Sequence, residues 1–160
     1  MEPAELGSQL KIFGNVMGCD RRLTADFLMK VVQETMKILE MDHFVLTTQN
    51  LEACLRFYTE MLGMEQKETN GRFILRFGAQ KINIHTRPAE FLPAAEHPVA
   101  GSLDLCFAIE DDIEAVLAEL KGKNAQLVTG IVERNGAKGK MRSIYLRDPD
   151  GNLIEIASYH

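Results

Sequence analysis

Cysteine is scarce in this sequence, and its spacing excludes a disulfide framework. The 160 residues contain three cysteines, Cys19, Cys54 and Cys106, and no C-x-x-C pair. An odd number without that spacing is typical of reduced, mostly buried thiols in a reducing compartment. Cys54 and Cys106 fall within apolar patterns, so we expect both side chains to lie in the core.

Long apolar runs and an excess of basic residues are also missing. No run approaches the length of about 18 to 20 residues that spans a bilayer, and no signal-peptide apolar core stands at the N-terminus. The formal net charge is -5, which argues against a nucleic-acid partner and against a polybasic membrane contact. We therefore expect a cytoplasmic protein that binds neither nucleic acid nor membrane.

The composition that is present is typical of a globular protein. Hydrophobic residues make up 46% of the chain and charged residues 26%, values at which wholesale disorder is not expected. The length accommodates one domain or two small modules that share a core.

The first 37 residues differ from the rest of the chain. Behind a possible cap at Thr24, apolar residues recur at helical spacing in TADFLMKVVQETMK, which predicts a short amphipathic helix. We interpret residues 1–37 as an N-terminal extension and residues 38–160 as a separate domain.

From residue 38 onward the same order of elements occurs twice. In the first unit, about residues 38–87, the alternating stretch ILEMDHFVLTT predicts a strand, NLEACLRFYTEMLGM predicts a helix capped by Asn50, and MEQKET, RFILRFG and KINIHTR predict three more strands. In the second unit, about residues 102–158, SLDLCFAIE is followed by a helix in EDDIEAVLAELKGKN and by strands in AQLVTGIVE, MRSIYLRD and NLIEIAS. The fold class is therefore α+β, with two βαβββ modules joined by a proline-containing linker, and the repeat is the main organising feature.

Superposing the two units places four polar residues at equivalent positions. His43 aligns with Asp104 in the first strands, and Asn83 aligns with Glu155 in the last strands. Side chains alternate across a strand, so these four point away from the helices. If the sheets combine into a partly closed barrel, the four side chains meet on its concave lining, where imidazole and carboxylate groups are suitable ligands for a divalent cation.

The chain resembles the vicinal oxygen chelate superfamily, which includes glyoxalase I, fosfomycin resistance enzymes, extradiol dioxygenases and bleomycin-resistance binding proteins. The paired modules, the opening MDHFVLTTQNLEACLRFYTEMLGM and the closing IYLRDPDGNLIEI carry the resemblance, which covers about residues 38 to 158. HPVAGSLDLCF and GAKGKMRSIYLRDPDGN are most similar to a glyoxalase-like group that lacks a firmly assigned reaction.

The resemblance implies a metal site made by the first and last strands of the units. His43 and Glu155 match the ligand positions, and Asp104 stands where related enzymes commonly have histidine. Asn83 departs from the glutamate of glyoxalase I and is a weaker, neutral group. The implied site is His43, Asp104 and Glu155 around a divalent ion such as Mn, Fe, Ni, Co or Zn. His85 lies two residues beyond Asn83 on the same face, so it is an alternative ligand in place of Asp104, a catalytic base, a substrate contact or a buried histidine without such a role.

The resemblance implies a metal-dependent enzyme of the lyase or isomerase type that acts on a small oxygen-chelating substrate, with Glu155 and His85 as candidate catalytic groups. Two alternatives stay open: a metal-free protein that sequesters a drug or metabolite, and an extradiol-type dioxygenase. The resemblance also implies a homodimer, in which His43 of one chain can meet Asp104 and Glu155 of the other.

A basic, glycine-rich segment, RNGAKGKMR, lies at residues 134–142. We interpret it as a loop that either closes over an anionic substrate or is simply solvated. The candidate substrate contacts are Asn83, Arg134, Lys138 and Tyr145. In the following turn, Arg147 and Asp150 are expected to fix the RDPDG backbone.

Overall fold

The computed structural model describes residues 36–159. The chain divides into two units, Met1–Glu40 and Met41–His160, and the description below concerns the second unit. The helix expected within residues 24–36 lies outside the described residues, apart from its last position.

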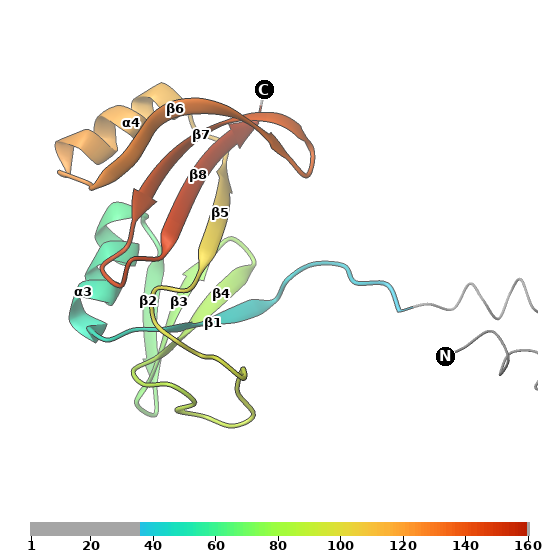
Figure 1. Cartoon of the computed structure of the whole chain (residues 1–160), viewed down its shortest axis with the longest axis vertical. Coiled ribbons are helices and arrows are strands. Elements are labelled where there is room, and N and C mark those ends of the chain that lie inside the picture. Colours follow the sequence, from blue (N-terminus) through green and yellow to red (C-terminus); the bar gives the residue numbers. More distant parts are fainter. Residues whose placement is uncertain (1–35, 160) are drawn as a thin grey trace, which may run out of the picture. The chain divides into compact units, whose positions relative to one another are not determined.

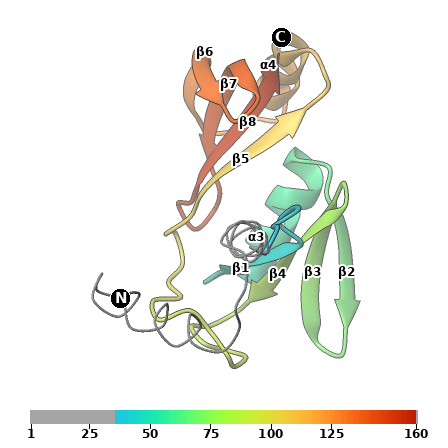
Figure 2. The ribbon, with the colours of Figure 1, turned by 90° about the vertical axis from the view of Figure 1, so that its right-hand side faces the viewer.

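The first four strands form one mixed sheet with the order β1-β4-β3-β2, which is visible in Figure 2. β1 pairs parallel with β4, and the β2–β3 and β3–β4 pairs are antiparallel. The elements of this module are β1 (His43–Thr47), α3 (Leu51–Arg56), η1 (Phe57–Met61), β2 (Glu65–Thr69), β3 (Arg72–Phe77) and β4 (Gln80–His85).

The second sheet repeats that topology with the order β5-β8-β7-β6 (Figure 1). β5 pairs parallel with β8, and the other two pairs are antiparallel. Its elements are β5 (Asp104–Ile109), α4 (Ile113–Gly122), β6 (Leu127–Gly136), β7 (Gly139–Arg147) and β8 (Leu153–Tyr159). The expected α+β fold of two βαβββ modules is confirmed, and within residues 36–159 the two sheets are not joined to each other by strand pairing.

The register of the strands confirms the superposition of the two units. Asn83 on β4 pairs with Val45 on β1, and Glu155 on β8 pairs with Cys106 on β5. Val45 and Cys106 are 61 residues apart, the same separation as His43 and Asp104. The last strands therefore meet the first strands at the same register in both modules.

Each helix begins at a side-chain cap. The Asn50 side chain accepts a hydrogen bond from the Ala53 N–H, and Asp112 does the same for Ala115. α3 is short and continues into the π-helical turn η1, which is one way that a chain accommodates an extra residue in a helix. This turn contains Tyr58, whose side chain is fully buried.

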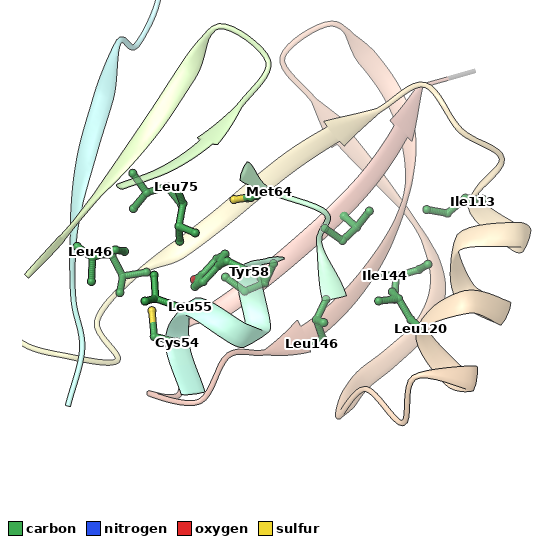
Figure 3. Close-up of a cluster of buried hydrophobic side chains, with 14 residues drawn as sticks. Leu46, Cys54, Leu55, Tyr58, Met64, Leu75, Ile113, Leu120, Ile144 and Leu146 are labelled. Carbon is green, nitrogen blue, oxygen red and sulfur yellow. The ribbon is translucent and has the colours of Figure 1, made fainter. Parts of the chain in front are cut away.

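The hydrophobic core consists of the helix-facing side chains of both sheets together with the inner faces of α3 and α4. In Figure 3, Leu46 and Leu75 lie near the α3 residues Cys54 and Leu55, and Leu120 of α4 lies beside Ile144. The alternation of apolar residues along each strand determines this face, because residues two apart on a strand point the same way.

The RDPDG turn ties the second module to the first. Asp148 is 5% exposed, and its carboxylate accepts hydrogen bonds from the Asp150 and Asn152 N–H groups, from Asn152 Nδ2, and from the Tyr58 hydroxyl at 2.9 Å. The Gln49 N–H donates to Asp150 Oδ1, and Arg147 Nη1 donates to the Gly151 carbonyl. Arg147 fixes the turn as expected, whereas the Asp150 side chain bonds to Gln49 of the first module, and the buried residue that holds the turn is Asp148.

Two expectations from the sequence are wrong. Cys54 is fully buried, whereas Cys106 is exposed, because its side chain points to the face of the second sheet opposite α4. The segment 134–142 is not an extended loop: β6 runs to Gly136 and β7 starts at Gly139, with Arg134 paired to Met141 and Asn135 to Lys140. The antiparallel ladder fixes the basic side chains on defined faces of the sheet.

Burial of Cys54 gives an expected dependence of stability on alkaline pH. Burial, with the nearby Asp148 charge, raises the pKa of the Cys54 thiol to about 12 from 9.0. The unfolded thiol loses its proton above about pH 9 while the folded thiol keeps it, so the free energy of unfolding falls between these values by up to about 1.4 kcal/mol per pH unit. Urea unfolding measured from pH 8 to 10.5 should show a smaller decrease of the free energy of unfolding with pH for Cys54→Ala than for the wild type. The same decrease in both proteins would contradict this assignment.

Candidate functional site on the helix-free faces

The predicted site residues lie on the faces of the two sheets opposite their helices, which we call the helix-free faces. On the first sheet, the pairings of β1 with β4 place His43, Val45, Asn83 and His85 on this face. On the second sheet it carries Asp104, Cys106, Ser143, Tyr145 and Glu155. These residues alternate with the core side chains, so the helix-free face is defined by the backbone pleat.

Glu155 is the central acidic group of the second sheet. Its side chain is 8% exposed, and its buried Oε1 atom has no hydrogen-bond partner among residues 36–159. Buried polar atoms in folded proteins are rarely left unpaired, so this oxygen is available to a hydrogen-bond donor or a cation. This carboxylate is therefore not on a solvated strand face.

Tyr145 links Glu155 to a cation. It pairs with Glu155 across β7 and β8, and Nε of Arg134 donates to its hydroxyl oxygen at 3.2 Å. Burial, followed by the hydrogen bond with Glu155, raises the pKa of the Tyr145 phenol, and the hydrogen bond from Arg134 partly opposes that shift. A guanidinium, a phenol and a carboxylate therefore lie next to one another on three neighbouring strands.

Cys106 adjoins Glu155 on the other side. The two residues are direct partners across β5 and β8. Although Cys106 is exposed as a residue, its thiol is partly desolvated beside Glu155, and this desolvation followed by the Glu155 charge raises the pKa of the thiol to about 11, so the thiol is protonated at neutral pH. Sequence reasoning missed this residue although it lies two positions from Asp104, which places both side chains on one face.

His43 lies on the first sheet, and its ring is partly exposed. Its Nδ1 atom is 2.6 Å from Oδ1 of Asp42, and this hydrogen bond is the main reason that the pKa of Asp42 lies below its usual value. In the tautomer that donates from Nδ1, the Nε2 atom keeps a free lone pair. A histidine held by a carboxylate in this way is the usual arrangement of a metal-binding imidazole.

His85 is placed differently from His43. It is 9% exposed, and its ring meets Phe91 of the linker edge-to-face at a centroid distance of 5.1 Å. The Arg72 guanidinium lies 4.1 Å above the centroid of the Phe91 ring. His97, by contrast, is exposed in the linker.

The second sheet brings Glu155, Tyr145 and Arg134 together on one face. Asp104 lies on the same face, two residues before the β5 residue that pairs with Glu155. His43 and Asn83 stand on the other sheet. Among residues 36–159 of a single chain, no three histidine, cysteine, aspartate or glutamate side chains lie close enough to hold a metal ion. None of the helices in this part of the chain is long and apolar enough to cross a membrane.

Comparison with known proteins places this geometry in a family. The family model of the Glyoxalase/Bleomycin resistance protein/Dioxygenase superfamily matches residues 40–156. The chain belongs to this superfamily. The match spans both modules, and with it the two helix-free faces that carry the predicted residues.

Individual relatives agree with this assignment. Virulence protein STM3117 from Salmonella typhimurium is 47% identical over 125 residues, which are 78% of this chain and 87% of that protein; its crystal structure matches with a TM-score of 0.76 and covers 78% of this chain and 100% of that one. Glyoxalase domain-containing protein RDO1 from Mycosarcoma maydis is 44% identical over 128 residues, 79% of this chain and 72% of that protein. Lactoylglutathione lyase from Agrobacterium tumefaciens shares the fold, with 20% identity, a TM-score of 0.60 and coverage of 76% of this chain and 95% of that one.

Proposed function

We propose that this protein is a glyoxalase-like, metal-dependent enzyme of the lyase or isomerase type, which acts on a small substrate with two adjacent oxygen atoms. The observation that supports the proposal is Glu155, a carboxylate more than nine-tenths buried with one oxygen unpartnered. A carboxylate in that position is costly unless a cation or a hydrogen-bond donor compensates it.

The residues present fit a divalent metal ion. The unpartnered Glu155 oxygen, the Asp104 carboxylate and the free nitrogen of His43 are the donors that such an ion accepts. When bound, the metal would act as a Lewis acid that polarises a substrate oxygen. Three ligands leave further coordination positions for the substrate.

We propose that two copies of the chain complete each site, because a single chain does not assemble the three donors within residues 36–159. His43 of one copy would then meet Asp104 and Glu155 of a second copy in a symmetric homodimer. Superfamily membership supports this arrangement, and it accounts for a buried Glu155 oxygen that finds no partner within residues 36–159 of its own chain.

Glu155 is also the group that we assign to proton transfer. Its carboxylate can take a proton from the carbon beside a substrate carbonyl and return it to the neighbouring carbon. Tyr145, which lies beside Glu155 across β7 and β8, can hold and orient that carboxylate. His85, under the Phe91 ring, remains a candidate for a second acid or base, and Asn83 for a substrate contact.

Metal analysis of protein purified without chelators tests the proposal. We expect about one divalent ion per wild-type chain, and less than about one tenth of that in Glu155→Gln, which keeps the shape of the side chain but loses its charge. Glu133→Gln, at an exposed glutamate on β6, is the matched control and should retain the metal.

Other outcomes would assign the protein differently. A wild-type protein without metal, which binds no divalent ion when the ion is supplied, would exclude the enzyme proposed here and favour a sequestering role. Iron together with oxygen uptake on catechols would favour a dioxygenase.

A further inference from the structure

The two modules enclose a cleft along the outer edge of β5. Its volume is about 660 Å³, which lies within the range of about 300 to 1,000 Å³ that is typical of small-molecule sites. The proposed metal ligands His43, Asp104 and Glu155 are not among the described residues that line it, so the cleft is distinct from the proposed metal site. Its apolar walls include Met61, Leu62 and Phe77 of the first module and Phe107, Val116 and Ile156 of the second.

The strand β5 contributes both side chains and backbone groups to this cleft. It is the outermost strand of the sheet β5-β8-β7-β6, so within residues 36–159 no strand pairs with its outer edge. Residues of both its faces therefore line the cleft: Cys106 and Ala108 from the helix-free face, and Phe107 and Ile109 from the α4 side. The outer edge of such a strand carries N–H and C=O groups that are free to bond a ligand.

The wall from the first module is formed by the end of η1 and the residues that follow it. η1 is a π-helical turn, a feature that is frequent at functional sites, and its last residue, Met61, lines the cleft together with Gly63 and Met64. A β-carbon at Gly63 would meet nothing within 4 Å, so the backbone there borders open space. Methionine side chains adapt to irregular apolar shapes and make favourable contacts with aromatic rings.

Two contacts between the modules hold the walls of the cleft together. The rings of Phe77 on β3 and Phe107 on β5 meet edge-to-face, with a centroid distance of 5.1 Å. Nζ of Lys123, at the end of α4, donates to the Glu60 carbonyl of η1 at 2.8 Å and also to the Glu119 carboxylate. These contacts form without any ligand, and a largely preformed shape is typical of a small-molecule site.

The charged groups that line the cleft balance one another. Glu119 and Lys123 form an ion pair, and the other two charged lining residues, Asp111 and Lys138, are of opposite sign. The cleft therefore has no excess charge that would compensate an ion as it leaves water. Its aromatic and methionine surface favours an uncharged, apolar ligand.

We propose that this cleft binds an uncharged, largely apolar small molecule. Met61, Phe77 and Phe107 supply the apolar contacts, and the outer edge of β5 supplies hydrogen bonds to polar atoms of the ligand. The inference does not depend on the proposed metal site. A ligand in this position covers the Cys106 thiol, which is exposed in the protein alone.

Binding of Nile red, an uncharged apolar dye, to the variant Cys19→Ser tests the inference. The remaining thiols of this variant are the fully buried Cys54 and the exposed Cys106. Fluorescence titration should show saturable binding of about one dye per chain, and the bound dye should slow the reaction of Cys106 with N-phenylmaleimide. Prior reaction of Cys106 places a phenyl ring in the cleft and should raise the Kd of the dye at least about tenfold. The double variant Cys19→Ser/Cys106→Ser, treated with the same reagent, is the matched control and should keep its Kd.

A second pair of variants fills the cleft without thiol chemistry. Ala108 lines the cleft and is exposed, so Ala108→Trp should fold and should also raise the Kd of the dye at least about tenfold. Ala95→Trp, at an exposed position of the linker, is the control and should leave the Kd unchanged.

The possible outcomes separate this inference from the metal proposal. No saturable dye binding, an unchanged Kd after Cys106 is labelled, or equally tight binding of the anionic dye anilinonaphthalene sulfonate would overturn the inference. Dialysis against a chelator should leave Nile red binding unchanged, which supports the cleft whether or not the purified protein contains a metal. Loss of dye binding on removal of a metal would place the dye in the metal site and overturn the inference.

Discussion

Asp148→Ala is expected to lower the free energy of unfolding by at least about 3 kcal/mol. Asp148 accepts four hydrogen bonds in a nearly inaccessible position. Its removal leaves the fully buried Tyr58 hydroxyl and the Asn152 amide without acceptors, and each buried donor left unpaired costs about 1 to 3 kcal/mol. The loss should appear as a lower urea midpoint with an unchanged slope.

The same turn supplies a matched control for Asp148→Ala. Asp150 carries the same charge two residues away, but within residues 36–159 its side chain accepts a single hydrogen bond, from the Gln49 N–H. Asp150→Ala should cost about 1 kcal/mol. Tyr58→Phe, which removes one of the four donors to Asp148, should fall between the two variants. Equal losses for Asp148→Ala and Asp150→Ala would show that the buried network does not hold the modules together.

Mixing two inactive variants should restore metal sites to about one quarter of the wild-type number. His43→Ala and Glu155→Gln each remove one ligand, so neither homodimer has an intact site. In a shared-site heterodimer, the Glu155→Gln chain supplies His43 and the His43→Ala chain supplies Glu155, which gives one complete site of two. Half of the randomly mixed dimers are heterodimers, and each heterodimer has one complete site of two. About one quarter of all sites should therefore be complete.

Unfolding and refolding the two variants together, followed by gel filtration and metal analysis, measures this recovery. Refolding each variant alone is the control and should give almost no metal. Absence of recovery in a proven heterodimer would place His43 and Glu155 in separate sites. A monomer on gel filtration would exclude subunit-shared ligands altogether. If His43→Ala unfolds the protein, the histidine has a structural role, and the intact fold of the variant must therefore be shown by circular dichroism.

Local patterns predicted most of the fold correctly. Alternation of apolar residues gave the strands, Asn50 marked the start of α3, and the order of elements revealed the two modules. These features depend on residues close in the chain, so the sequence carries them directly. The register of Val45 with Asn83 and of Cys106 with Glu155 also follows from the repeat, because both modules bury the same alternate residues.

For the site, the sequence predicted which face of a strand each residue occupies, but not which residues of other strands lie beside it. The sequence placed Glu155, Asp104 and His43 on the helix-free faces, and the pairings agree. It did not show that Tyr145 and Cys106 stand on either side of Glu155, because those neighbours depend on which strands pair. It also assigned Cys106 to the core, since a thiol in an apolar stretch is compatible with either face.

The amino-acid order alone determined the repeated modules, the caps and the alternate faces of each strand, because these are set by hydrogen bonding and side-chain direction over short distances. Tertiary structure decided which distant groups meet: Tyr58 with Asp148, Arg134 with Tyr145, and Arg142 with Glu114. Those contacts depend on how strands pair and how the modules pack. Strand pairing and module packing depend on which residues of the whole chain become buried together, so no single segment determines them.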